Sequence, residues 1–268
     1  MTDDRNAEPA EIDGADVQAL VENLLEPATM QAIFEESAAT LGQTLTSDSL
    51  LETVAKAVAV TEDVWRDVEV DQPAYACRKG CSWCCHQTVM VTAPEVLAAA
   101  AYLRETRTPA ELDTLKRHLE ERSEEIAGRS TGERFAAGLA CGLLEDGACS
   151  IHPARPFMCR GGFSEDAGFC EDLYNDYRGV IEAVHTGKRE ETFLLAPKMI
   201  FNSAQVGLAT ALRERGKRCE GLELTAALRI ALDDPDIAKT WLADEAVLDA
   251  ARLHRRGSDY VTSAETAS

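Results

Sequence analysis

The placement of the cysteines constrains this chain more than any other feature of its sequence. Eight of the nine cysteines lie between Cys77 and Cys170, and Cys219 stands alone further along the chain. The acidic N-terminus lacks the basic start and apolar run of a secretory signal, which predicts a cytoplasmic protein. In a reducing compartment, closely spaced cysteines are more often metal ligands or redox thiols than disulfides.

The first cysteine group is the ten-residue stretch CRKGCSWCCH, residues 77–86. Its four thiols are Cys77, Cys81, Cys84 and Cys85, and Gly80 loosens the backbone between them. Such a segment can curl around one ion or cluster, which neither a helix nor a strand could do.

The second cysteine group is more widely spaced and follows a long stretch with helical patterning. It contains Cys141, Cys149 and Cys159, and Cys170 follows it. Two such groups predict one folded site assembled from both.

The distribution of charge supports this interpretation. Lys and Arg number 27 against 47 Asp and Glu, a formal balance of −20. Against that balance, residues 77–86 carry Arg78 and Lys79 and no acid, and residues 149–163 carry Arg155 and Arg160 and no acid. Cations beside thiolates lower thiol pKa values and offset the negative charge of a thiolate-bound centre. The alternative is that these basic residues pair with acids on the surface.

Adjacent cysteines limit the chemistry that the site can have. Cys84 and Cys85 cannot easily bind one small tetrahedral ion together, so one of them serves a second metal, a polynuclear cluster or nothing. Zinc prefers four thiolate or imidazole ligands, and eight cysteines could supply two such sites. Iron–sulfur clusters are also usually held by four cysteines, which would leave the other thiols as accessory groups. The spacing alone does not choose between these metals.

The two groups together resemble the YkgJ-like cysteine-cluster family, which is described as zinc- or iron-chelating. The family pattern is Cys-x-x-x-Cys-x-x-Cys-Cys followed by Cys-x-Ile-Tyr-x-x-Arg-Pro-x-x-Cys-Arg. Here the second segment is CSIHPARPFMCR, residues 149–160, with His152 in place of the usual Tyr. Thr92 and Glu95 are similar to the helix start that follows the first group in the family. The resemblance covers about residues 77–170.

The resemblance implies metal chelation and leaves the activity open. One branch of the family, similar to the flagellin lysine N-methylase FliB, implies S-adenosylmethionine-dependent methyl transfer to a protein lysine, with an iron–sulfur centre. No residue in this sequence selects that branch. The spacing of Cys77, Cys81 and Cys84 also fits the radical S-adenosylmethionine motif, but that class requires repeated strand–helix units that this sequence does not predict.

The predicted ligands are the cysteines of both groups, namely Cys77, Cys81, Cys84, Cys85, Cys141, Cys149, Cys159 and Cys170. His152 is a further candidate, and His86 is interpreted as a bystander. We expect Arg155 and Arg160 to donate hydrogen bonds to thiolates or cluster sulfurs, and Pro156 to hold the turn that returns Cys159 toward Cys149. Because these thiols exceed the needs of one tetrahedral ion, an iron–sulfur or polynuclear iron centre is favoured over a single zinc.

The rest of the chain predicts a mainly α-helical protein. Ala and Leu supply most apolar residues, aromatic residues make up 6% of the chain, and apolar side chains recur at helical spacing. The expected helices cover residues 17–25, about 50–60 after a capping box of Ser49 and Glu52, 93–103 after Thr92, 109–126 after Thr108, 200–212, and 224–232. The one expected β-hairpin lies between Cys141 and Cys149, where Asp146-Gly147 forms the turn.

These patterns predict five regions along the chain. They are a disordered acidic tail (1–15), N-terminal helices (16–70), the cysteine-cluster metal-binding region (71–175), C-terminal helices that pack on it (176–256) and a disordered tail (257–268). Trp65 and Trp241 are expected in the core, and Cys219 outside the site.

Net charge and hydropathy limit the partners. The acidic balance disfavours nucleic acid and anionic membrane surfaces, and no stretch reaches the roughly 18 apolar residues of a membrane span. Two classes of function stay open. One is a metal-binding module for structure, metal handling or electron transfer; the other is an enzyme, with S-adenosylmethionine as cofactor and a protein as substrate.

Overall fold

The computed structural model describes residues 27–40, 46–257 and 259–263. Within these ranges helices dominate and every sheet has two strands, which confirms the predicted mainly α fold with a small β-hairpin. The predicted acidic tail and the predicted helix at residues 17–25 lie outside the described residues. None of the helices in these ranges has both the length and the apolar composition that crossing a membrane requires.

The elements follow one another with short connections. The α-helices are α2 (Pro27–Thr40), α3 (Ser47–Glu69), α4 (Ala93–Thr106), α5 (Pro109–Ile126), α6 (Thr131–Ala136), α7 (Phe157–Arg160), α8 (Ala167–Asn175), α9 (Tyr177–His185), α10 (Leu195–Glu214), α11 (Leu224–Asp233) and α12 (Ile237–Ala243). The 3-10 helices are η1 (Trp83–His86), η2 (His152–Ala154) and η3 (Glu245–Ala251). The strands are β1 (Met90–Val91), β2 (Leu144–Glu145), β3 (Ala148–Cys149), β4 (Leu222–Glu223), β5 (Leu253–Arg256) and β6 (Asp259–Thr262).

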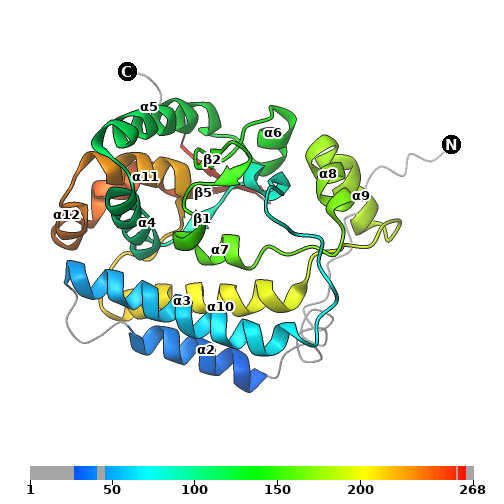
Figure 1. Cartoon of the computed structure of the whole chain (residues 1–268), viewed down its shortest axis with the longest axis horizontal. Helices are drawn as coiled ribbons and strands as arrows, with labels where there is room; N and C mark the ends of the chain where they lie inside the picture. Colours follow the sequence, from blue (N-terminus) through cyan, green and yellow to red (C-terminus); the bar gives the residue numbers. More distant parts are fainter. Residues whose placement is uncertain (1–26, 41–45, 258, 264–268) are drawn as a thin grey trace, which may run out of the picture.

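Three long helices, α2, α3 and α10, form a layer along one side of the molecule (Figure 1). Helices α2 and α10 approach closely at Gly207, where an added Cβ would lie 2.7 Å from the carbonyl oxygen of Phe34. Glycine therefore allows the two backbones to pack tightly. Sequence periodicity did not predict α2, because the apolar residues of this helix form no clear stripe along one face.

The helix starts agree in part with the predicted caps. Thr92 and Thr108 begin α4 and α5 through capping boxes with Glu95 and Glu111, as predicted. The predicted start of α3 is wrong: Thr46 is its N-cap and its side chain accepts a hydrogen bond from the backbone N–H of Ser49. The hydroxyl of Ser49 accepts in return from the backbone of Thr46, so hydroxyls make both capping bonds.

One continuous hydrophobic core fills the space between the helical layers. Trp65 and Trp241 are buried in it, at 7% and 1% exposure, as expected for core tryptophans. A separate small cluster, built on Phe169, Leu173 and Val180, lies under α8 and α9 at one end of the molecule (Figure 1).

The short sheets connect distant parts of the chain. The predicted hairpin is confirmed as β2 paired with β3, with Leu144 opposite Cys149. Strand β1 pairs with β4, which places Met90 opposite Glu223. A second hairpin, β5–β6, pairs Leu253 with Thr262. The prediction of a disordered tail from residue 257 is therefore wrong for residues 259–262, which form β6.

Candidate metal centre

The two cysteine segments meet through backbone contacts at both ends. The N–H of Cys141 donates to the carbonyl of Cys85 at 2.6 Å. At the other end, the N–H of Ala76 donates to Ser164 at 2.8 Å, and the N–H of Ser164 donates to the sulfur of Cys77 at 3.4 Å. These contacts support the expectation that both groups build one site.

Tight turns concentrate the thiols of the first segment. The N–H of Cys81 donates to the carbonyl of Arg78 at 2.9 Å, and Gly80 between them has φ 90°, which glycine adopts without strain. Helix η1 follows and carries Cys84 and Cys85. The segment thus turns twice within ten residues.

The adjacent thiols Cys84 and Cys85 are linked by a side-chain hydrogen bond. This bond lowers the pKa of Cys84 to about 7 and raises that of Cys85. A pair in which one sulfur carries the charge and its neighbour holds the proton fits the expectation that both do not bind the same small ion.

The β2–β3 hairpin shapes the second segment. Asp146 and Gly147 have φ values of 49° and 75°, as a two-residue hairpin turn with positive φ at both positions requires. The hairpin returns the chain, so that Cys149 at the end of β3 comes back toward Cys141. Pro156 then precedes α7, which carries Cys159, and the N–H of Cys159 donates to the carbonyl of Pro156 at 3.0 Å.

Backbone N–H groups point at two sulfurs of the second segment. Burial raises the pKa of Cys141 to about 11, and hydrogen bonds from the N–H of Leu143 and the hydroxyl of Thr225 oppose that rise. Burial likewise raises the pKa of Cys149, and the N–H of Ile151 opposes it. In both cases the donor lies two residues after the cysteine. Such N–H donors stabilise a thiolate, the form that binds metal.

Electrostatic interactions link thiols of both segments. Burial raises the pKa of Cys159, and Cys141, Cys84 and Cys149 add to the rise. Burial also raises the pKa of Cys170 to about 11, with contributions from Cys77 and other thiols of the first segment. The eight predicted cysteine ligands therefore lie in one region, and all nine cysteines are free thiols. Cys219 packs against the main core.

The sulfurs are gathered but not yet arranged as the ligands of a bound ion. Among the residues that the structure describes, no group of three or more Cys, His, Asp or Glu side chains stands in metal-binding geometry. The donor chemistry nevertheless fits zinc or iron, because thiolates are ligands that both metals accept. Binding would require the thiols to lose protons and to rotate toward the metal.

Arg155 is the cation that interacts with thiols of both segments. Burial raises the pKa of Cys77 and of Cys149, and the guanidinium of Arg155 opposes the rise at both. Its Nη1 lies 2.9 Å from Nε2 of His152, whereas its buried Nε has no partner among the described residues. The Nε–H of Arg155 is thus a donor that the predicted hydrogen bond to sulfur can use. That hydrogen bond stays a prediction.

Arg160 has different contacts from those predicted for it. Its guanidinium donates to the carbonyls of Arg155 and Pro153, at 2.8 and 2.6 Å, and pairs with Glu62 on α3. Within the described chain its hydrogen bonds go to oxygen, so Arg160 holds the loop before α7 instead of facing a sulfur. The alternative that basic residues of this segment pair with surface acids holds for this residue.

The candidate ligands Cys170 and His152 differ in their surroundings. Cys170 is buried on α8, and the hydroxyl of Ser164 hydrogen-bonds to it. Because Ser164 also contacts Cys77, one residue joins both thiols. His152 is exposed in η2, with its ring beside Arg155.

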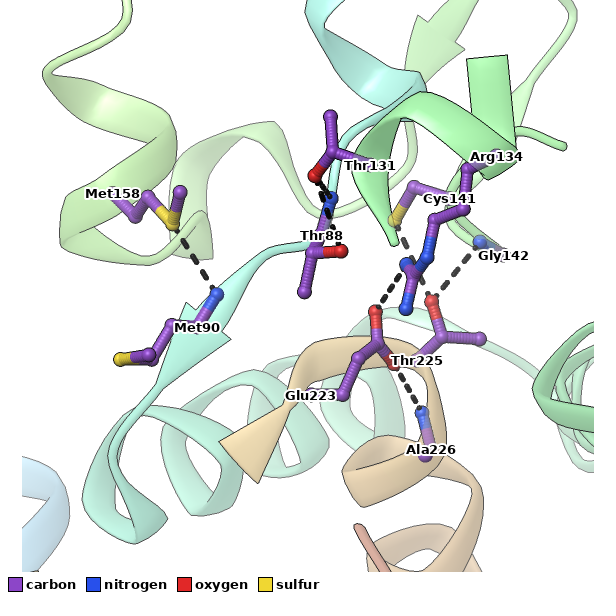
Figure 2. A network of polar contacts seen from close by, with 10 residues as sticks. All are labelled: Thr88, Met90, Thr131, Arg134, Cys141, Gly142, Met158, Glu223, Thr225 and Ala226. Carbon is purple, nitrogen blue, oxygen red and sulfur yellow. Dashed lines mark hydrogen bonds and ion pairs between the residues drawn. The ribbon is translucent and has the colours of Figure 1, made fainter. Parts of the chain in front are cut away.

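Two residues beside the centre were not predicted from the sequence. Thr225, the second residue of α11, donates from its hydroxyl to the sulfur of Cys141 at 3.9 Å and accepts from the N–H of Gly142 at 3.3 Å (Figure 2). Gln205 on α10 donates to the buried carboxyl of Glu95 at 3.0 Å. Both come from helices far along the chain, and no local motif marks them.

A buried ion pair lies next to Thr225. Arg134 on α6 donates to Glu223 at 2.9 Å, and both side chains are 2% exposed (Figure 2). Glu223 also caps α11, since its second oxygen accepts from the N–H of Ala226 at 2.9 Å. The pair thus fixes the start of α11, which carries Thr225 toward Cys141.

Aromatic rings cover the outer face of η1. Tyr174 on α8 lies 5.3 Å from Trp83 and 4.7 Å from His86, measured between ring centroids. Phe135 on α6 continues this cluster. His86 therefore packs among rings, in keeping with its interpretation as a bystander.

A helical protein that gathers free thiols from two segments in this way has the character of a metal-chelating protein. In agreement, residues 76–175 match a family model that carries the description "Putative zinc- or iron-chelating domain" and is called CxxCxxCC after its cysteine pattern. Over these residues the chain is therefore similar to that cysteine-cluster family. Comparisons with curated proteins and with solved structures found no match.

Proposed function

We propose that residues 76–175 bind zinc or iron through the thiols of both cysteine segments. The observation that carries this proposal is the contact between the segments, in which the N–H of Cys141 donates to Cys85 at 2.6 Å. The contact lies between two candidate ligands that are far apart in sequence. The proposed ligands are Cys77, Cys81, Cys84, Cys85, Cys141, Cys149, Cys159 and Cys170.

For the kind of centre, we favour iron–sulfur or polynuclear iron over a single zinc. A tetrahedral zinc ion takes four ligands, whereas eight free thiols are available here. The hydrogen bond between Cys84 and Cys85 lowers the pKa of Cys84 and raises that of Cys85, so Cys84 offers a thiolate to a metal more readily and Cys85 must first lose its proton. Arg155 offsets the negative charge that thiolates accumulate.

Metal binding is the only function that we carry forward. Radical S-adenosylmethionine chemistry would need a parallel sheet, and the sheets in the described chain are antiparallel pairs. For protein lysine methylation, a pocket for S-adenosylmethionine beside the thiols is needed. One cavity of about 480 Å³ lies between α2 and α3, where Ala32, Ile33 and Val64 line it and no cysteine does. The cavity beside the thiols has only about 280 Å³, below the roughly 300–1,000 Å³ typical of pockets for drug-sized ligands.

The test is metal and sulfide analysis, with an absorption spectrum, of protein purified without oxygen. The proposal predicts stoichiometric bound metal. Iron with acid-labile sulfide and visible absorption would support the favoured cluster, and iron without sulfide would support a polynuclear iron site. Colourless protein with stoichiometric zinc would overturn the preference for iron but keep the function. Protein that binds neither metal, even after reduction and reloading, would refute the proposal.

A further inference from the structure

A small polar cavity lies beside the first cysteine loop. Its volume is about 280 Å³, and its walls are residues 78–83 together with Ala167 at the start of α8. We call this cavity the loop pocket. One of its lining residues is Cys81, so the pocket opens onto a thiol that we propose as a metal ligand.

Two cations of the loop pocket, Arg78 and Lys79, have no acid partner among the described residues. Arg78 and Lys79 are exposed, and neither forms an ion pair or a side-chain hydrogen bond with another residue of the described chain. Other basic residues do find acids, for example Arg107 with Glu145 at 2.8 Å. In a protein with a formal charge of −20, two adjacent unpaired cations at a concave site create a local field that favours anions.

The backbone turn keeps both cations at the wall of the pocket. Arg78 and Cys81 are joined by the hydrogen bond of the turn, at 2.9 Å, and Lys79 and Gly80 lie between them. Gly80 has φ 90°, and an added Cβ there would meet no atom within 4 Å. The glycine is thus required by the conformation of the turn, and not by crowding.

The loop pocket also has two neutral residues in its wall, and the acid Asp166 directly precedes its lining residue Ala167. Ser82 and Trp83 also line the pocket, and their side chains carry a hydroxyl and an indole N–H, groups that can donate to an oxyanion. The ring of Trp83 packs on Tyr174. Asp166 precedes Ala167, and its carboxylate accepts from the N–H of Gly168 at 2.8 Å as the cap of α8.

We propose that the loop pocket binds a small oxyanion, that is, the phosphate or carboxylate group of a small molecule. Its volume is below the roughly 300–1,000 Å³ of pockets for drug-sized ligands, so it suits a single such group. Arg78 and Lys79 supply the charge-assisted hydrogen bonds that oxyanions require. A bound oxyanion would touch Cys81, which gives the metal centre a neighbouring position for an anionic small molecule.

Titration of the metal-free, reduced full-length protein tests this proposal separately from metal binding. The probes are inorganic phosphate and acetate at constant ionic strength, with chloride as reference. The readout is tryptophan fluorescence, because Trp83 lines the pocket whereas Trp65 and Trp241 are buried. The variant is the double substitution Arg78→Gln, Lys79→Gln. Its matched control is Arg178→Gln, Lys188→Gln, two exposed residues outside the pocket that remove the same charge.

We expect a saturable response to at least one probe, and the identity of that probe says whether phosphate or carboxylate is preferred. The pocket variant should weaken this binding by roughly tenfold or more, and the control variant should bind as the wild type does. No saturable response to either probe would overturn the proposal. Equal weakening in both double variants would also overturn it, because the effect would then come from net charge alone.

Discussion

At the scale of single residues, the thiol of Cys141 depends on a side chain from another part of the chain. Thr225 is fully buried and is the only side chain for which we find a hydroxyl hydrogen bond to Cys141 among the described residues. Outer hydrogen bonds of this kind orient metal ligands and tune their basicity. Thr225 is accordingly a positioning residue for the proposed centre.

We predict that Thr225→Val lowers the affinity for zinc about tenfold or more, whereas Thr225→Ser stays close to the wild type because it keeps the hydroxyl. The measurement is competition with a chromophoric chelator, on variants whose folding circular dichroism has verified. Thr61→Val is the matched control, since Thr61 is also fully buried but its hydroxyl donates to Ala57, at 2.6 Å. Equal affinity of Thr225→Val and Thr61→Val would contradict the assignment.

The protonation of the thiols makes a second prediction at this scale. Burial raises the pKa of Cys77, Cys149 and Cys159 above the usual range, and that of Cys141 to about 11. Neutral thiols must lose protons when they bind metal, so the apparent affinity should increase from about pH 6 to about pH 8. Calorimetry in buffers of different ionisation enthalpy should detect proton release. Affinity that is independent of pH would mean that these thiols are not ligands.

The contacts of single residues also show what the sequence could and could not predict. The cysteines and the Arg-Pro pair are local patterns that can be recognised in the sequence, and the family match at residues 76–175 covers the same region. The contacts of Arg160 could not be predicted, because Glu62 lies on α3, far from the cysteines in sequence. Only tertiary packing brings the two side chains together.

At the scale of elements, two helices start in the same way but have different surroundings. The carboxyl of Glu95 accepts hydrogen bonds from the N–H and hydroxyl of Thr92 at 2.7 and 2.8 Å, and Glu111 accepts from Thr108 in the same way, at 2.7 Å for both. Only Glu95 is buried, and only it bonds to other elements, namely Phe157 at the start of α7 and Gln205 on α10. Glu95 thus fastens the helix that carries Cys159 to two long helices.

Glu95→Ala should lower the free energy of unfolding by about 3 kcal/mol, because it leaves buried donors without partners. Glu111→Ala is its matched control and should cost about 1 kcal/mol or less, since an exposed cap is replaced by water. Urea unfolding of both variants measures the difference. Similar costs for the two substitutions would show that the contacts of Glu95 with α7 and α10 contribute little.

The elements differed in how well their sequence predicted them. Capping boxes and the Asp146-Gly147 turn are short-range signals with a direct physical cause, and the structure confirms α4, α5 and the β2–β3 hairpin. Helix α2 was not predicted, because its apolar residues form no clear stripe along one face. The β5–β6 hairpin was missed because its strands, Leu253–Arg256 and Asp259–Thr262, show no regular alternation of apolar and polar residues.

At the scale of the whole molecule, charge and topology act together. The chain has a formal charge of −20, yet residues 77–86 and residues 149–163 each carry two cations and no acid. The fold divides these cations among different tasks: Arg155 faces the thiols, Arg160 holds a loop, and Arg78 and Lys79 line the loop pocket. The sequence shows that cations lie beside cysteines along the chain. Which contacts each cation makes depends on the elements that pack beside its segment.

The central claim is that both segments hold one metal centre, and metal content measured after identical anaerobic purification tests it most directly. The proteins compared are the wild type, Cys81→Ala from the first segment, Cys141→Ala from the second and Cys219→Ala as a cysteine outside the site. The account predicts stoichiometric zinc or iron in the wild type and in Cys219→Ala, and loss of most of it in the other two variants. Unchanged metal content in Cys81→Ala and Cys141→Ala would contradict the claim.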